Sequence, residues 1–148
     1  MVTLFKKIIH APLVGWRWSM AIQNAARNDY SSALVNLNYL SDFFDNNNIE
    51  FHLLKGICEF GNGDNERSVT DFEIAINLLK EGLNKYTQFE KKYLTAYALV
   101  FGGLANKNLS ESKKSSAFSE VLWKDVDLTK VRKHLKQKFP LRRHPNWE

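Results

Sequence analysis

The positions of the prolines constrain the fold of this chain more than any other feature of its sequence. Pro12, Pro140 and Pro145 all lie near the ends of the 148 residues. The stretch from Leu13 to Phe139 therefore contains no residue that must break a helix. Apolar residues recur along it at helical spacing, and no two-residue alternation is long enough to indicate a strand. We predict an all-α fold.

Turn-forming and capping residues divide this pattern into segments. They are Asn28-Asp29, Asp45 to Asn48, Gly63-Asp64-Asn65, Ser110 and Asp127, with Pro140 at the last helix end. The predicted helices span 2–9, 14–27, 30–46, 49–61, 65–83, 87–106, 111–123 and 128–139. With 44% hydrophobic residues, the chain is predicted to form a single helical domain over 1–148 that ends in a short tail at 140–148.

Two stretches of the chain share one spacing of small and apolar residues, at an offset of 35 positions. The first runs Ala21, Asn28, Ala33, Leu37, Leu40, and the second runs Gly56, Gly63, Ser68, Phe72, Ala75. Small residues at the first and third positions of each set let two antiparallel helices approach closely. The larger residues then fill the seam between the helices. We therefore interpret the sequence "GNGDN" at 61–65 as the turn of a helical hairpin.

Two other interpretations of "GNGDN" fail on its neighbours. A phosphate-binding loop would end in Gly-Lys-Ser/Thr, whereas Glu66-Arg67 stands there. A calcium loop from Asp64 would need glycine and glutamate where Val69 and Ala75 stand.

The repeated spacing resembles the tetratricopeptide repeat (TPR), a helix–turn–helix unit of about 34 residues. The resemblance covers residues 14–83, where "NDYSSAL" and "GDNERSV" are similar to the family's turn and second-helix start. Ala21, Glu59 and Asn65 depart from the family's usual residues. The resemblance implies a superhelical stack of antiparallel hairpins. The apolar stripe of Leu128, Val131 and Leu135 predicts that the helix at 128–139 docks on this stack as a C-terminal capping helix.

The resemblance also implies a concave face, lined by the first helix of each hairpin, that binds the ligand. Its lining residues would be Trp18, Ile22, Glu50, Leu53, Ile57 and Phe60. Because so apolar a groove should not stay open to water, either a partner or one of the chain's own terminal helices fills it. Trp16 and Trp18 point about 200° apart on a helix, so one of them is expected at an interface.

Positive charge is concentrated at the C-terminal end. Residues 1–129 hold 14 bases and 15 acids, so residues 130–148 supply the whole excess of the net charge of +5. An acidic protein partner, a nucleic acid and a merely solvated helix face would each fit this segment. We predict that it meets a partner protein with an acidic surface, through Arg132, Lys133, Lys136, Arg142, Arg143 and Trp147.

The residues that could carry chemistry are not spaced for it. The histidines at 10, 52, 134 and 144 have no second ligand at a metal-binding spacing. Cys58 and His52 lie six positions apart, which turns them to different sides of a helix. The "SESK" sequence at 110–113 fits a helix cap better than a Ser-x-x-Lys nucleophile. We expect no catalysis, no metal and no cofactor.

These observations favour a non-catalytic protein-binding module. We expect an inhibitor of the immunity or antitoxin type, which masks a partner protein. The alternatives are an adaptor or chaperone for one client, and a nucleic-acid-binding protein that uses the basic C-terminal segment. One cysteine cannot form an internal disulfide and no apolar run would span a bilayer, so we expect a cytoplasmic protein.

Reversing three bases of the C-terminal segment tests its predicted role. Arg132, Lys133 and Lys136 changed together to glutamate should preserve the helical circular dichroism and slow association with an acidic partner. Stopped-flow kinetics at several salt concentrations measure this, and most of the salt dependence should disappear. Unfolding of the variant, or unchanged association at low salt, would contradict the prediction.

Overall fold

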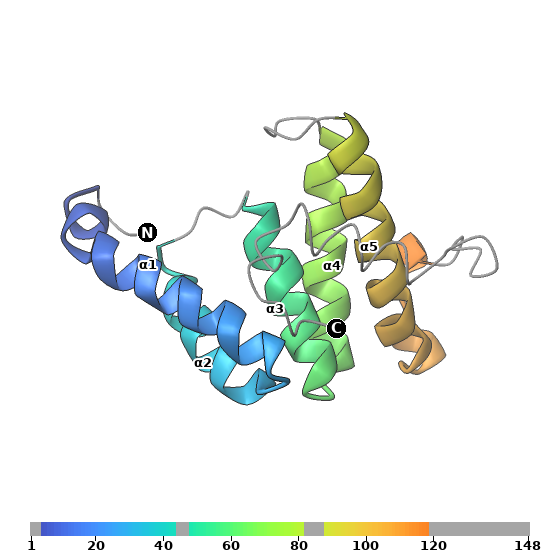
Figure 1. Ribbon diagram of the computed structural model, residues 1–148. Helices are drawn as coiled ribbons and strands as arrows, with labels where there is room; N and C mark the ends of the chain where they lie inside the picture. The colour runs from blue at the N-terminus through green and yellow to red at the C-terminus, as the bar shows by residue number, and fades with distance from the viewer. Residues whose placement is uncertain (1–3, 44–47, 82–87, 119–148) are drawn as a thin grey trace.

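The computed structural model describes residues 4–43, 48–81 and 88–118, and these residues are helical apart from their turns (Figure 1). The α-helices are α1 (Leu4–Ala26), α2 (Tyr30–Leu40), α3 (Ile49–Gly61), α4 (Asn65–Glu81) and α5 (Gln88–Lys107). Two 3-10 turns follow, η1 (Glu111–Lys113) and η2 (Ser116–Phe118). No strand occurs within these ranges, which confirms the all-α prediction. None of the described helices is long and apolar enough to cross a membrane.

Helix boundaries differ from the prediction in three places. The two predicted N-terminal helices are one helix, α1, which continues through Pro12. Helix α2 ends at Leu40, because the hydroxyl of Ser41 bonds to the carbonyl of Asn38 at 2.7 Å and turns follow. The prediction of an α-helix at 111–123 is wrong for residues 111–118, because the backbone is extended at Lys114 between η1 and η2. The predicted helix at 128–139 lies outside the described residues.

The turn between α1 and α2 and the turn between α3 and α4 have the same backbone hydrogen bonds at equivalent positions. Asp29 N–H donates to the carbonyl of Asn24, and Asp64 N–H donates to that of Glu59, both at 2.9 Å. Asn28 and Gly63 both adopt positive φ angles, 62° and 85°. The carboxylates of Asp29 and Asp64 cap the following helices by accepting from Ser32 and Arg67 backbone N–H groups. Every one of these equivalent positions is 35 residues apart, so the offset predicted from sequence holds in the backbone.

The seam between α3 and α4 closes on Gly56. The Ser68 hydroxyl donates to the carbonyl of Gly56 at 2.8 Å, and a Cβ placed on Gly56 would meet the Phe72 ring at 3.0 Å. The equivalent residues of the α1–α2 hairpin, Ala21, Ala33 and Leu37, are also completely buried. The close approach predicted at Gly56 and Ser68 is therefore confirmed for α3 and α4, and the equivalent small residues of α1 and α2 are buried.

One core joins the elements. The Tyr30 ring at the start of α2 packs directly on Gly61 at the end of α3, and the Ser31 hydroxyl bonds to Asn62. On the other side, Phe118 of η2 lies on Gly102 of α5, whose backbone also approaches Phe72. Figure 1 shows the consequence: the α1–α2 hairpin forms one end of the described fold, and α5 lies beyond α4.

Substitution of Gly56 tests the seam. Gly56→Leu should lower the free energy of unfolding by about 1–3 kcal/mol, because the new side chain must displace the Phe72 ring. Gly15→Leu is the matched control, since a Cβ on Gly15 meets nothing within 4 Å. Urea unfolding of the two variants measures the difference. Equal stability of the Gly56 variant and the wild type would show that α3 and α4 are not in close contact there.

Candidate functional site

The six predicted groove residues divide by exposure. Ile22, Leu53 and Ile57 are buried in the core, with exposures of 7%, 0% and 6%. Trp18 and Phe60 are partly buried and pack against that core, and Glu50 is partly exposed. Most of this face is therefore interior and does not offer open apolar surface. The predicted residues Arg132, Lys133, Lys136, Arg142, Arg143 and Trp147 lie outside the described residues.

A buried polar cluster joins α3 to α4 beside this face. His52 Nδ1 lies 2.8 Å from Asp71 Oδ1, and Lys55 Nζ lies 3.7 Å from Asp71 Oδ2. Glu59, one turn further along α3, lies beside Asp71, each group shifts the pKa of the other, and Glu59 Oε1 is buried without a hydrogen-bond partner. Three side chains of one α3 face thus converge on one carboxylate of α4. Only the Lys55 side chain is substantially solvated, at 25% exposure.

Burial and partners set the charges in this cluster. Loss of water around Glu59, together with its hydrogen bond to Asp71, raises its pKa to about 9, so Glu59 is protonated at neutral pH. Burial also acts to raise the pKa of Asp71. Hydrogen bonds from His52 and Glu59 and the nearby Lys55 charge outweigh that effect, and the pKa of Asp71 falls below its ordinary value. Asp71 is therefore the anion, and His52 must carry its proton on Nδ1 to donate to it.

The cluster contains the residue types of a catalytic acid–base pair, but His52, Glu59 and Asp71 are buried between the two helices. Cys58, the one cysteine of the chain, also lies on α3. It is completely buried, and loss of water raises the pKa of its thiol to about 12. A protonated, inaccessible thiol is not a nucleophile. Within the described ranges no group of three or more His, Cys, Asp or Glu side chains could hold a metal ion. We interpret the cluster as a polar pin between the two helices.

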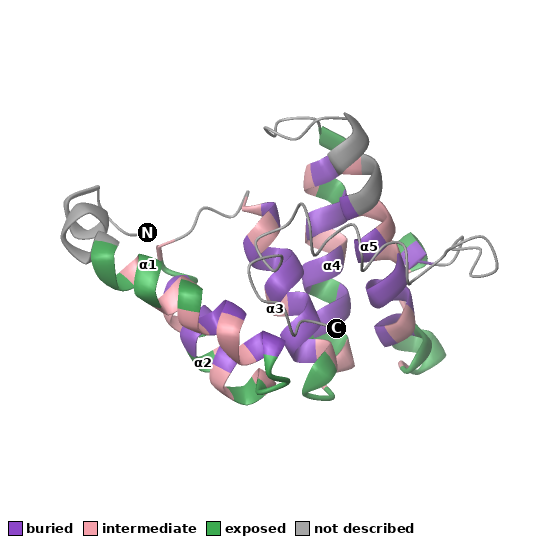
Figure 2. Ribbon diagram, viewed as in Figure 1, coloured by how far each residue is buried: buried purple, intermediate pink, exposed green. Residues whose placement is uncertain are grey.

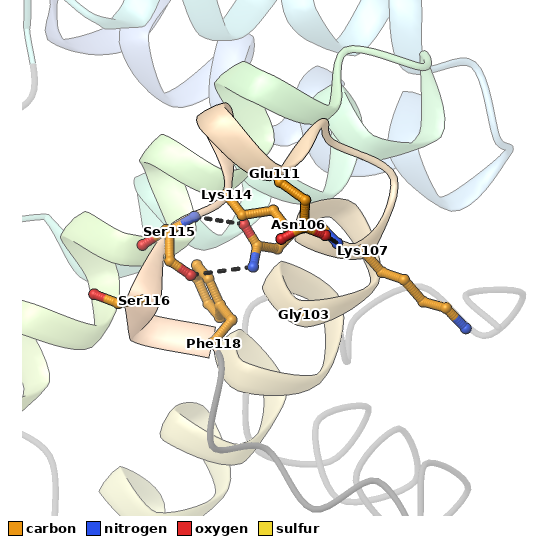
Figure 3. A pocket seen from close by; sticks show the side chains of 8 residues that line it. All are labelled: Gly103, Asn106, Lys107, Glu111, Lys114, Ser115, Ser116 and Phe118. Atoms are coloured by element: carbon orange, nitrogen blue, oxygen red, sulfur yellow. Dashed lines mark hydrogen bonds and ion pairs between the residues drawn. The ribbon is translucent and has the colours of Figure 1, made fainter.

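A surface cavity of about 430 Å³ lies at the end of α5 (Figure 3). Its floor is a reciprocal clamp: Asn106 donates to the Ser115 carbonyl at 3.1 Å and accepts from the Ser115 N–H at 2.7 Å. The Ser115 hydroxyl bonds to Glu73, and Lys114 pairs with Glu111 at 2.8 Å. These polar groups form hydrogen bonds and an ion pair with one another. They hold the segment after α5 against the body. Ser110 makes no side-chain cap there, so its predicted capping role is wrong.

Exposed apolar side chains gather instead on the first hairpin. Among the described residues, the large hydrophobic side chains that are exposed are Leu13, Trp16 and Val35, at 37%, 55% and 64%. The Arg17 guanidinium lies over two aromatic rings, 5.5 Å from the centre of Trp16 and 4.8 Å from that of Tyr39. Figure 2 shows this exposed stretch of α1 beyond the buried part of the hairpin.

Part of this surface could be predicted from helix geometry. Trp16 and Trp18 were expected on opposite sides of a helix, and Trp18 packs on the core while Trp16 points to solvent. Arg17, Val35 and Tyr39 were missed, because only α2 packed beside α1 brings them together. No family model, curated protein or solved structure matches the chain.

The protonated state of Glu59 predicts a pH dependence of stability. The pKa of Glu59 is higher in the folded than in the unfolded chain. Its contribution to the free energy of unfolding is therefore complete below about pH 4.5 and is lost as the pH rises toward 9. Glu59→Gln keeps a hydrogen-bond donor but cannot ionise. Relative to wild type, this variant should therefore gain up to about 1.4 kcal/mol per pH unit in that window.

Urea unfolding at several pH values between 5 and 9 measures this gain. Glu66→Gln is the control, because Glu66 is an exposed carboxylate on α4 whose Lys113 partner is also exposed. A stability difference between the Glu59 variant and wild type that does not change with pH would show that Glu59 is ionised in the folded protein.

Proposed function

We propose that this chain is a non-catalytic protein-binding module that binds and masks a partner protein, as inhibitors of the immunity or antitoxin type do. One observation carries the proposal. The imidazole, carboxyl and thiol groups of His52, Glu59, Asp71 and Cys58 are buried in or beside the α3–α4 seam, while Trp16 is exposed on the first hairpin beside the partly exposed Arg17 and Tyr39. Tryptophan, tyrosine and arginine are the residues that contribute most to binding energy at protein interfaces.

The proposal includes a TPR-like stack as the scaffold. Its support is the 35-residue equivalence of the two turns and the close approach of α3 and α4 at Gly56. Repeat scaffolds of this kind present extended surfaces that bind partners. We place the protein in the cytoplasm, in keeping with a single cysteine that is free and buried.

Affinity capture with the tagged full chain in its native host, followed by reconstitution of the purified pair, tests this function. The expected result is a stoichiometric complex with one protein, measured by calorimetry, in which the partner loses its own activity. The two alternatives predict different results. A client handed on in active form would favour an adaptor or chaperone, and a complex that nuclease treatment dissolves would favour a nucleic-acid-binding protein. Either of these results would overturn the proposal.

A further inference from the structure

Exposed and partly buried side chains of α1 and α2 meet around Arg17 on the first hairpin. We define this surface as the Trp16 edge, made of Leu13, Trp16, Arg17, Val35 and Tyr39. The guanidinium of Arg17 contacts the rings of Trp16 on α1 and Tyr39 on α2, which joins the two helices. Leu13 precedes Trp16 by three positions and Val35 precedes Tyr39 by four, so each apolar side chain adjoins a ring on its own helix.

Arg17 and Asn36 of the first hairpin occupy the repeat positions that His52 and Asp71, the polar pin, occupy in the second hairpin. Arg17 Nη1 donates to Asn36 Oδ1 at 3.0 Å, while His52 Nδ1 lies 2.8 Å from Asp71 Oδ1. Arg17 precedes His52 by 35 positions, and Asn36 precedes Asp71 by the same number. The two hairpins therefore place one donor on the first helix against one oxygen acceptor on the second.

The two pins differ in charge. In the second hairpin the acceptor is the ionised carboxylate of Asp71, which balances the nearby Lys55. In the first hairpin the acceptor is the neutral amide of Asn36, whose orientation is fixed by a bond from its Nδ2 to the carbonyl of Ser32. A permanently charged guanidinium thus faces a neutral amide at the position where the second hairpin supplies an anion.

Among the residues that the structure describes, no acidic side chain of the hairpin pairs with this charge. Residues 1–28 contain no aspartate or glutamate. Asp29 and Asp42 lie in the turns that bound α2, and neither forms an ion pair with Arg17 within the described part of the chain. Arg17 Nε is also buried there without a hydrogen-bond partner. One donor of the guanidinium, Nε, therefore has no partner, and the group lies over two aromatic rings.

We infer that the Trp16 edge binds a carboxylate side chain flanked by apolar residues, presented by a segment of the partner protein. The inference rests on the proposed function and names the chemistry of the partner. Guanidinium and carboxylate groups match in shape and form strong charge-assisted hydrogen bonds. The neighbouring rings hold Arg17 in place before binding, which reduces the entropy lost on association. Leu13, Trp16 and Val35 then receive the apolar neighbours of the carboxylate.

A defined peptide library tests the inference with the full chain. Random dodecapeptides displayed on phage are selected against wild type, with Arg17→Gln, Trp16→Ala and Arg27→Gln in parallel. Arg27 is the matched control, because it is an exposed arginine at the other end of the same hairpin. Circular dichroism checks that each variant folds. Wild type and Arg27→Gln should select peptides with an Asp or Glu beside apolar residues, and the other two variants should not.

A double-mutant cycle with one selected peptide then measures the contact. Replacing the peptide's acid by its amide should weaken binding to wild type about tenfold or more, and binding to Arg17→Gln less than about twofold. Trp16→Ala should weaken binding about 30-fold. Additive losses from Arg17→Gln and the peptide amide would overturn the inference.

The other outcomes separate the inference from the proposed function. Selected peptides without an acid, no selected peptides, or binding only to vesicles of phosphatidylcholine and phosphatidylglycerol would each overturn the Trp16 edge as a site for an acidic segment. If a reconstituted partner is masked equally well by wild type, Arg17→Gln and Trp16→Ala, the inference fails while the proposed function stands. If peptides bind as expected but no partner is masked, the proposed function fails alone.

Discussion

The close contact of α3 and α4 at Gly56 is the constraint on which the rest of the described fold depends. Because Gly56 has no side chain, the Ser68 hydroxyl reaches its carbonyl and the Phe72 ring lies against its backbone. Phe72 is completely buried and also meets Gly102 of α5. One aromatic side chain thereby sets the spacing of α3, α4 and α5, and the polar pin of His52 and Asp71 forms alongside it.

The same hairpin occurs twice but is completed differently. In the second hairpin, the pin is buried and its charges are balanced by Asp71 within the seam. In the first hairpin, the equivalent amide leaves Arg17 unbalanced, next to exposed Trp16. Leu13, Trp16 and Val35 are the large hydrophobic side chains that the described part of the chain exposes, and all three lie on the first hairpin. A binding function would account for their exposure.

Sequence reasoning succeeded where local chemistry decides the structure. The helix predicted at 49–61 has those bounds, because Asn48 caps its start and the turn at Gly63 ends it. It failed where a residue's effect depends on distant partners. Pro12 did not divide the N-terminal helix, and Ser110 did not begin one, since the side chain of Asn106 holds the backbone of Ser115 nearby. These contacts exist only after the chain has folded.

The candidate site shows the same division. Opposite directions for Trp16 and Trp18 follow from helix geometry alone, and the structure confirms them. The 35-residue offset was recognised from small and apolar residues, whereas applying it to polar residues would have matched Arg17 with His52 and Asn36 with Asp71. What no spacing could reveal is that Glu59 lies buried beside Asp71, because its protonation follows from desolvation in the packed seam.

The unbalanced charge of Arg17 is the central claim, and the pKa of a carboxyl placed beside it is the most direct measurement. Asn36→Asp introduces that carboxyl at the position that matches Asp71, and its titration can be followed by carbon-detected NMR of the full chain. The account predicts a lower pKa than for the same carboxyl in an Arg17→Gln background, because the nearby guanidinium stabilises the anion while burial of position 36 acts alike in both proteins. Equal pKa values in the two proteins would contradict the account, because they would show that the charge of Arg17 is already compensated.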